Sequence, residues 1–244
     1  MELCDKHVHT VFSDGKNTPE EVVLEAIARK MEVLGFSDHS YTAFDENWCM
    51  KKEDIPLYRA CIAELRARYA GRIKILCGIE QDFYSEEPTE GYDYVIGSVH
   101  YLRAGEEHIP VDESPEILRA AAEKHFGGDI YALIEEYYRT VARVVEKTGA
   151  DIIGHFDLIT KFNEGGALFD EADPRYLAAS RGAADALLRT GRPFEINTGA
   201  ISRGYRKVPY PAPPLLAYIR QRGGEVLLSS DAHCAAHIGY GFAR

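Results

Sequence analysis

Leu3-Cys4-Asp5-Lys6-His7-Val8-His9 opens the chain as a short strand pattern that ends in two histidines. Alternate residues of a strand point the same way, so His7 and His9 can reach the same side of one site. The arrangement returns near the other end of the chain, where an apolar run leads into Ser230-Asp231-Ala232-His233. Histidine and carboxylate are ligands of Zn²⁺, Mn²⁺ and Fe. These two strand ends therefore predict a metal site.

Four further segments place the same residue types where a predicted strand gives way to a loop. They are Ser37-Asp38-His39, Gly78-Ile79-Glu80, Ser98-Val99-His100 and Gly154-His155-Phe156-Asp157. A loop motif, Phe12-Ser13-Asp14-Gly15, adds one more carboxylate, although it could equally be a plain turn. The candidate ligands are His7, His9, Asp14, His39, Glu80, His100, His155, Asp231 and His233. One ion takes three or four protein ligands, so this set implies two or three ions, with Glu80 able to bridge two of them.

The remaining histidines and the neighbouring aspartates have other predicted roles. His108, His125 and His237 lie in loop or helix-end contexts, where a surface or core role is expected. Four aspartates flank the ligands and are expected to accept hydrogen bonds from the histidine rings, not to bind metal directly. These are Asp5, Asp38, Asp82 and Asp157.

Apolar, β-branched runs alternate with helical periodicity along the chain. The predicted strands are Leu3–His9, Val33–Ser37, Ile73–Gln81, Tyr94–His100, Asp151–Asp157, Phe194–Thr198 and Val226–Asp231. The first predicted helix begins at Thr18-Pro19. The other predicted helices are Ile55–Tyr69, Pro115–His125, Asp129–Lys147, Pro174–Thr190 and Pro214–Arg222. Repeated βα units imply parallel strands. Every strand motif lies at a carboxyl end, where a barrel of the triosephosphate-isomerase kind builds its active site.

We therefore expect an α/β fold with a seven-stranded barrel in one domain, residues 1–244. An open sheet would gather its ligands mainly at one switch point, which fits six contributing strands less well. A final helix over the seventh strand is not evident in the sequence. The last βα unit is either abbreviated or cut short.

Bulk composition excludes several classes of protein. A net charge of −11 argues against a nucleic-acid-binding surface, which normally shows a basic stripe. The five cysteines are scattered without a C-x-x-C spacing, so neither a disulfide framework nor a zinc ribbon is expected. No apolar run approaches ~18 residues, and no signal-peptide pattern begins the chain. We expect a cytoplasmic protein with neither a membrane nor a nucleic-acid partner; the sequence leaves the oligomeric state open.

The predicted chemistry is metal-assisted hydrolysis of a phosphoester. Paired ions lower the pKa of bound water and neutralise charge that develops on a phosphoryl group. A basic loop, Ser202–Lys207, follows the sixth strand on the same face as the ligands. It is either a solvated loop or a phosphate clamp built on Arg203 and Arg206. Lys161, after the His155 motif, is a second candidate for binding phosphate.

The ordered series of motifs resembles the PHP (polymerase and histidinol phosphatase) superfamily, and within it the stand-alone histidinol-phosphate phosphatases. The match runs from Asp5-Lys6-His7-Val8-His9-Thr10 to Ser230-Asp231-Ala232-His233 and covers nearly the whole chain. The histidinol-phosphatase branch depends on Gly97–Tyr101, Glu195-Ile196-Asn197-Thr198 and the Arg203 loop. The resemblance implies a distorted (β/α)7 barrel and a centre of three Zn, Mn or Fe ions.

Carried onto this chain, the resemblance divides the ligands among three ions. One ion would take His7, His9, Glu80 and Asp231; a second Glu80, His100 and His155; a third Asp14, His39 and His233. Arg203 and Lys161 are the best candidates to bind the substrate phosphate, and Arg206 is the next. Asp231 is also the candidate acid that protonates the leaving alkoxide.

The expected activity is hydrolysis of L-histidinol phosphate to L-histidinol and phosphate, in histidine biosynthesis. The nearest alternative is a PHP phosphatase for another small phosphomonoester, such as a nucleotide or sugar phosphate. A PHP nuclease and a non-catalytic metal-binding module are the more distant alternatives.

Overall fold

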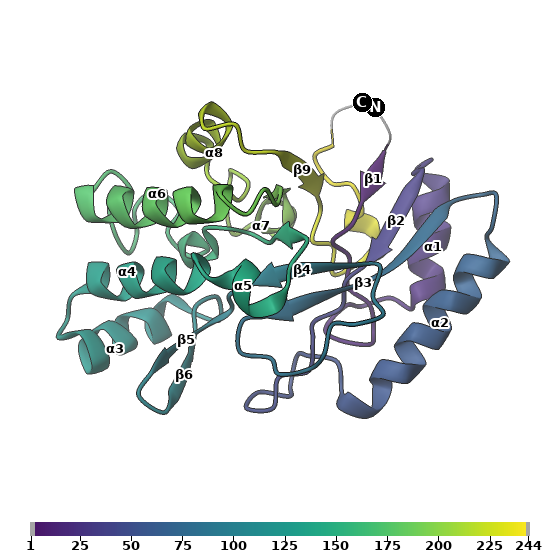
Figure 1. Cartoon of the computed structure of the whole chain (residues 1–244), viewed down its shortest axis with the longest axis horizontal. Coiled ribbons are helices and arrows are strands. Elements are labelled where there is room, and N and C mark those ends of the chain that lie inside the picture. Colours follow the sequence, from purple (N-terminus) through teal and green to yellow (C-terminus); the bar gives the residue numbers. More distant parts are fainter. Residues whose placement is uncertain (1–2, 243–244) are drawn as a thin grey trace.

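A parallel sheet of seven strands forms the centre of the computed structural model, which describes residues 3–242 (Figure 1). The strands lie side by side in chain order. They are β1 (Cys4–Asp5), β2 (Val33–Phe36), β3 (Lys74–Asp82), β4 (Tyr94–Ser98), β7 (Ile152–Ile153), β8 (Phe194–Asn197) and β9 (Val226–Ser229). Beyond β1 and β9, Val8 pairs with Ala232, and the His9 N–H donates to the Ala232 carbonyl (2.9 Å). The sheet is thus a nearly closed barrel, and the predicted fold is confirmed.

Helices connect the strands and cover the outside of the barrel (Figure 1). In the described part of the chain they are α1 (Pro19–Ala28), α2 (Ile55–Arg68), α3 (Pro115–Phe126), α4 (Ile130–Val141), α5 (Val144–Thr148), α6 (Pro174–Leu188), α7 (Gly199–Ser202) and α8 (Pro213–Gln221). Short 3₁₀ turns add η1 (Lys52–Asp54), η2 (Leu158–Thr160) and η3 (Ala235–His237). The first helix begins as predicted, because the Thr18 N–H donates to Glu21 Oε2 (2.8 Å) and the Glu21 N–H donates to Thr18 Oγ1 (3.4 Å).

Several local features differ from the prediction: β1 and β7 are shorter than the predicted strands Leu3–His9 and Asp151–Asp157, and α7 was not predicted. The helix expected over Asp129–Lys147 is interrupted at Ala142 and Arg143, so α4 and α5 are separate. Residues 101–110 form an antiparallel hairpin of β5 (Tyr101–Ala104) and β6 (Glu107–Pro110), for which the sequence predicted no element. Its turn passes through Gly105 at φ +62°, a conformation that glycine adopts without strain. The hairpin lies outside the barrel sheet and directly follows the carboxyl end of β4.

The hydrophobic core has two main clusters between the sheet and the surrounding helices, and a smaller cluster of Tyr94, Ile96 and Ile152. One lies under α1 and α2 and includes Leu34, Phe36 and Ile62, all fully buried. The other lies under α3, α4, α6 and α8 and includes Tyr137 and Phe194. Burial of apolar surface on both faces explains why the strands read as nearly continuous apolar runs.

Tyr94 of β4 forms hydrogen bonds to the backbone of β2 and of the segment after β1. Its hydroxyl lies 2.6 Å from the Lys6 carbonyl and 2.9 Å from the Phe36 carbonyl. Gly35 and Gly78 make room for the ring, because a Cβ at either position would overlap Tyr94. A large side chain on β4 therefore requires small residues on β2 and β3.

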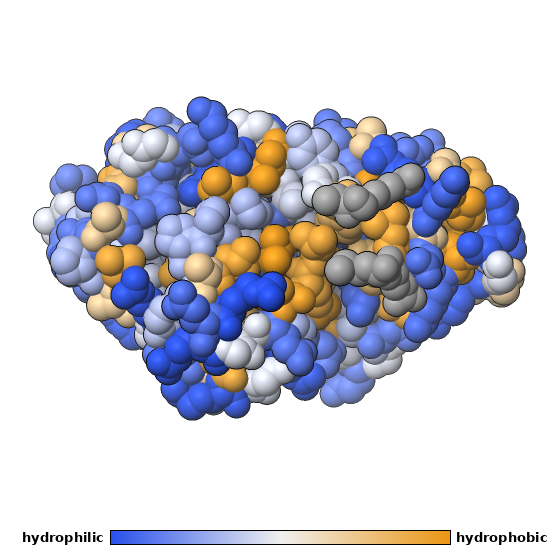
Figure 2. Space-filling model, turned by 90° about the horizontal axis from the view of Figure 1, so that it is seen from above, coloured by the Kyte–Doolittle hydropathy of each residue, from blue (hydrophilic) through white to orange (hydrophobic). Residues whose placement is uncertain are grey.

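Apolar side chains also reach one face of the molecule. In the view from above they gather at the centre of that face, with hydrophilic residues around them (Figure 2). Leu228 of β9 is 38% exposed, and the described residues after β9 form the 3₁₀ turn η3 and no α-helix. None of the described helices has the length and apolar character needed to cross a membrane.

Candidate active site

The nine predicted ligands converge at the carboxyl ends of the strands. Asp14 comes from the loop before α1, and the others lie on or just after β1, β2, β3, β4, β7 and β9. Seven of the nine are buried: His7, His9, His39, Glu80, His100, His155 and Asp231. Asp14 and His233 remain partly accessible at the side of the cluster that faces solvent.

Glu80 is the centre of the cluster. Its Oε1 lies 2.8 Å from His155 Nε2 and 3.5 Å from His100 Nε2. Its Oε2 lies 2.9 Å from His39 Nδ1, 3.2 Å from His7 Nε2 and 3.5 Å from His9 Nε2. Each carboxylate oxygen thus faces its own set of imidazoles, which is the geometry a bridging ligand needs.

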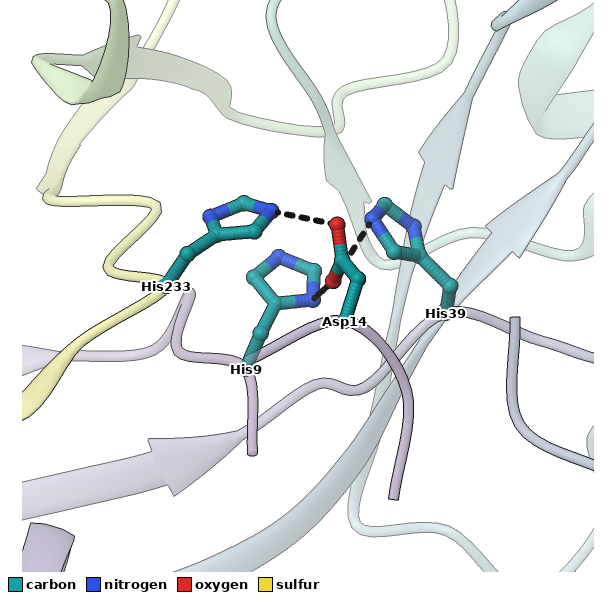
Figure 3. A group of neighbouring side chains, drawn as sticks. All are labelled: His9, Asp14, His39 and His233. Atoms are coloured by element: carbon teal, nitrogen blue, oxygen red, sulfur yellow. Dashed lines mark ion pairs between the residues drawn. The ribbon is translucent and has the colours of Figure 1, made fainter. Parts of the chain in front are cut away.

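A second group surrounds Asp14 (Figure 3). Asp14 Oδ2 lies 3.1 Å from His233 Nε2, and Asp14 Oδ1 lies 3.6 Å from His39 Nε2 and 3.8 Å from His9 Nδ1. The sequence grouped Asp14 with His39 and His233, and the structure adds His9 to them. His9 contacts both groups: its Nδ1 faces Asp14, and its Nε2 lies 3.1 Å from Asp231 Oδ1.

Asp231 is held in an unusual backbone conformation at the end of β9. Its φ is +50°, which a non-glycine residue rarely adopts and which often marks a functional position. Burial raises the pKa of the Asp231 carboxyl, but Arg203 and His7 outweigh burial and hold it well below its usual range. Asp231 is therefore a carboxylate at neutral pH, as a metal ligand must be.

The donor set fits bound cations. His7 Nε2, both ring nitrogens of His9, His39 Nδ1 and Glu80 Oε2 are buried without a hydrogen-bond partner. Unsatisfied polar atoms of this kind are costly unless another group meets them. Burial, with His233 and His39 nearby, lowers the pKa of His9 to about 3, so its ring is neutral and available as a ligand. Four groups of donors lie close enough to share an ion: His9-Asp14-His39-His233, His7-Glu80-His155, His7-His9-Asp231 and His39-Glu80-His100.

The structure identifies Glu195 of β8 as a supporting residue that the sequence analysis missed. The fully buried Glu195 carboxylate lies 2.5 Å from His7 Nδ1 and accepts the His155 backbone N–H (2.7 Å). A hydrogen bond at Nδ1 leaves the Nε2 of His7 free to face Glu80 and Asp231. The signal was present in the sequence, because Glu195 is a charged residue inside an apolar strand.

Among the flanking aspartates, only Asp82 has a hydrogen bond to a ligand histidine ring. Its Oδ2 lies 3.3 Å from His100 Nδ1. Asp5 instead accepts from Ser230, Asp38 from Thr10, and Asp157 from the Ala212 N–H. These three carboxylates fix the loops that hold the ligands.

A cavity of about 450 Å³ opens above the cluster, within the size range of small-molecule sites. Arg203 and Lys161 both line it, as predicted. Arg203 Nη2 donates to Asp231 Oδ2 (3.1 Å), and Lys161 Nζ donates to the Asp112 carbonyl (2.7 Å). Arg206 lies elsewhere: it is buried and its Nη1 donates to the Thr160 carbonyl (2.6 Å). The structure does not bring Arg206 to the cavity.

One wall of the cavity comes from the loop after β2 and the β5–β6 hairpin. Trp48 Nε1 donates to Tyr101 Oη (2.6 Å), and the Tyr101 hydroxyl donates to Asp45 Oδ2 (2.7 Å). The ring of Phe44 stacks on that of His108 with centroids 3.7 Å apart. Tyr101 thus lines the cavity, whereas Tyr137 and Tyr138 are buried in the core.

A barrel with a cluster of metal-type ligands at its carboxyl end is the architecture of a metal-binding barrel protein. Residues 5–239 match the PHP domain, so the chain belongs to the PHP family.

Two curated relatives are similar along almost the whole chain. A Deinococcus radiodurans protein named "Probable histidinol-phosphatase" is 34% identical, over 99% of this chain and 90% of that protein. The histidinol-phosphatase of Bacillus subtilis is 25% identical, over 99% of this chain and 97% of that protein.

Two solved structures share the fold. A candidate histidinol phosphatase of Listeria monocytogenes superimposes with a TM-score of 0.82 at 19% identity, covering 98% of each chain. A histidinol phosphate phosphatase of Lactococcus lactis, solved with Zn, L-histidinol and phosphate, gives a TM-score of 0.67 at 24% identity, covering 96% of this chain and 87% of that chain.

Proposed function

We propose that this protein is a cytoplasmic histidinol-phosphatase, which hydrolyses L-histidinol phosphate to L-histidinol and inorganic phosphate in histidine biosynthesis. The full-length similarity to the Deinococcus radiodurans protein is the observation that carries the substrate. The cavity supports the reaction class, because metal-type donors form its floor and Arg203 and Lys161 lie on its wall. Such a site suits a phosphomonoester, whose charge these groups can neutralise.

We infer that the donors hold three divalent ions, of Zn, Mn or Fe. His7, His9, Glu80 and Asp231 would hold one ion, Glu80, His100 and His155 a second, and Asp14, His39 and His233 a third. The donor groups in the structure support the sets around Asp14 and Asp231, with His9 near the third set as well. Around Glu80 they place His155 with His7 and His100 with His39, so the second set rests on the distances from Glu80 Oε1 to the rings of His155 and His100. When bound, such ions supply an activated water and neutralise charge on the transferred phosphoryl group.

The chain's own residues bind and orient the phosphate. Arg203 is fixed by Asp231 and keeps a buried Nε without a hydrogen-bond partner. The guanidinium lines the cavity, and such a group can bind phosphate through two donors at once. Lys161 Nζ is held by Asp112 at the side of the cavity and adds a second positive charge. Protonation of the leaving alkoxide by Asp231 stays a prediction, since the low pKa of this carboxyl favours a ligand role.

Steady-state kinetics on a panel of phosphomonoesters test the proposal. The metal-replete protein is given L-histidinol phosphate, p-nitrophenyl phosphate, glycerol phosphate and a nucleoside monophosphate, with Zn²⁺, Mn²⁺ or Fe²⁺ in turn. The highest kcat/KM is expected for L-histidinol phosphate. A higher value for another substrate contradicts the histidinol branch but keeps the phosphatase. Absence of turnover with every metal contradicts the enzyme.

A further inference from the structure

Asp45, Trp48 and Tyr101 form one wall of the cavity, and this wall carries a negative charge. Besides the predicted metal ligands, the charged cavity residues are Asp45, Asp112, Glu113, Lys161 and Arg203. Lys161 is paired with Asp112 (3.1 Å), and Arg203 is paired with Asp231 (3.1 Å). Within residues 3–242, Asp45 and Glu113 have no basic partner. The cavity thus holds two carboxylates that no basic side chain of the described residues neutralises.

Asp45 is the better positioned of these two carboxylates. Its Oδ2 accepts the Tyr101 hydroxyl, and its Oδ1 accepts the Asn47 N–H (3.4 Å) and side-chain amide (3.2 Å). Glu113 is exposed and has no such hydrogen bonds in the described structure. Burial raises the pKa of Asp45, but these hydrogen bonds outweigh burial and lower it, so the carboxylate is charged at neutral pH.

Two aromatic rings extend the same wall toward the metal-type cluster. Trp48 packs edge-on against His39, with centroids 4.5 Å apart, and lies beside His100 at 5.5 Å. Its indole N–H is used by Tyr101, which fixes the orientation of both rings. Aromatic rings beside a carboxylate favour a cation, since ring faces attract positive charge.

We propose that Asp45, positioned by Tyr101 and Trp48, is the residue that selects phosphomonoesters with a cationic leaving group. The ammonium or protonated ring of an amino alcohol lies against the Asp45 carboxylate while the phosphate lies over the cluster beside Arg203. This inference rests on the proposed function for the reaction class, and it assigns the choice between an amino-alcohol phosphate and a sugar or nucleoside phosphate to one side chain.

The test compares Asp45→Asn with Glu46→Gln in the metal-loaded, full-length protein. Asn keeps an acceptor for the Tyr101 hydroxyl but removes the charge. Glu46 is the next residue, bonds Tyr41 and Lys51 and does not line the cavity, so it is a matched control. Asp45→Asn is expected to lower kcat/KM for L-histidinol phosphate about 10-fold, mainly through KM, the equivalent of one charge-assisted contact. For p-nitrophenyl phosphate the change is expected to stay within about twofold.

Product inhibition separates recognition of the leaving group from catalysis. In Asp45→Asn the inhibition constant of L-histidinol is expected to rise about 10-fold, whereas that of inorganic phosphate stays within about twofold. Tyr101→Phe keeps the charge of Asp45 but removes the hydrogen bond that orients it, so a smaller rise in the inhibition constant of L-histidinol is expected. Equal losses for all substrates, or an unchanged inhibition constant for L-histidinol, would overturn the inference.

The wild-type substrate panel distinguishes failure of this inference from failure of the proposed function. Phosphoethanolamine, a cationic substrate without an imidazole, is included for this purpose. A wild-type preference for phosphoethanolamine over L-histidinol phosphate contradicts the proposed function and supports selection of a cation at Asp45. A preference for glycerol phosphate over both cationic substrates overturns the inference.

Discussion

Glu195 bonds four different residues behind the cluster. Besides His7 and the His155 N–H, it accepts the Asn197 side-chain amide (3.0 Å) and the Ser229 hydroxyl. Burial raises the pKa of Glu195, but the charge of His7 outweighs burial and lowers it. One carboxylate thus sets the ring orientation of His7, places the backbone of His155 and joins β8 to β9.

Glu195→Gln is expected to weaken metal binding about 10- to 100-fold, as loss of a carboxylate behind a ligand histidine commonly does. The glutamine side chain has one acceptor oxygen in place of two. Its NH₂ group would therefore face a donor, and at least one hydrogen bond would be lost. Titration of the metal-free protein with Zn²⁺ by calorimetry measures the affinity independently of turnover. Glu225→Gln, at an exposed glutamate before β9, is the control and should bind Zn²⁺ like the wild type. An unchanged affinity in Glu195→Gln would show that Glu195 has only a packing role.

At the scale of elements, the barrel strands were predictable because each is an apolar run, and six of the seven end in a metal-type motif. β8, for example, is predicted over Phe194–Thr198 and observed over Phe194–Asn197. The β5–β6 hairpin was not predictable, since its four-residue strands mix exposed and buried residues without a clear alternation. The cavity wall that includes Asp45 was missed for a related reason. It forms only when a loop and a hairpin far apart in the sequence pack together through Phe44 and His108.

The fit of β4 against β2 and β3 gives a prediction at this scale. Gly78→Ala is expected to destabilise the protein by about 1–3 kcal/mol, because the added methyl group overlaps the Tyr94 ring inside a packed barrel. Urea denaturation followed by circular dichroism measures the loss. Gly182→Ala on α6 is the control: apart from its chain neighbours and the backbone of its own helix, no atom of the described residues lies within 4 Å of the added Cβ, and alanine favours a helix by up to about 1 kcal/mol. If Gly78→Ala is as stable as the wild type, Tyr94 can move and does not tie the strands.

At the scale of the whole molecule, the ligands join the beginning of the chain to its end. His7 and His9 follow β1, whereas Asp231 and His233 follow β9, and these two strands meet where the barrel closes. Ions bound there would link both edges of the sheet and bind only the folded state. Stability of the barrel should therefore depend on metal.

Removal of metal by a chelator is expected to lower Tm by about 5–11 °C. An ion at 100 times its Kd adds about 2.7 kcal/mol, and each kcal/mol shifts Tm by about 2–4 °C in a chain of this size. Differential scanning calorimetry with and without Zn²⁺ measures the shift. His155→Ala should reduce it, because one set of ligands is incomplete, whereas His125→Ala should not, because His125 bonds Glu107 at the surface. A Tm that is the same with chelator and with Zn²⁺ would mean that the ions do not link the two edges of the barrel.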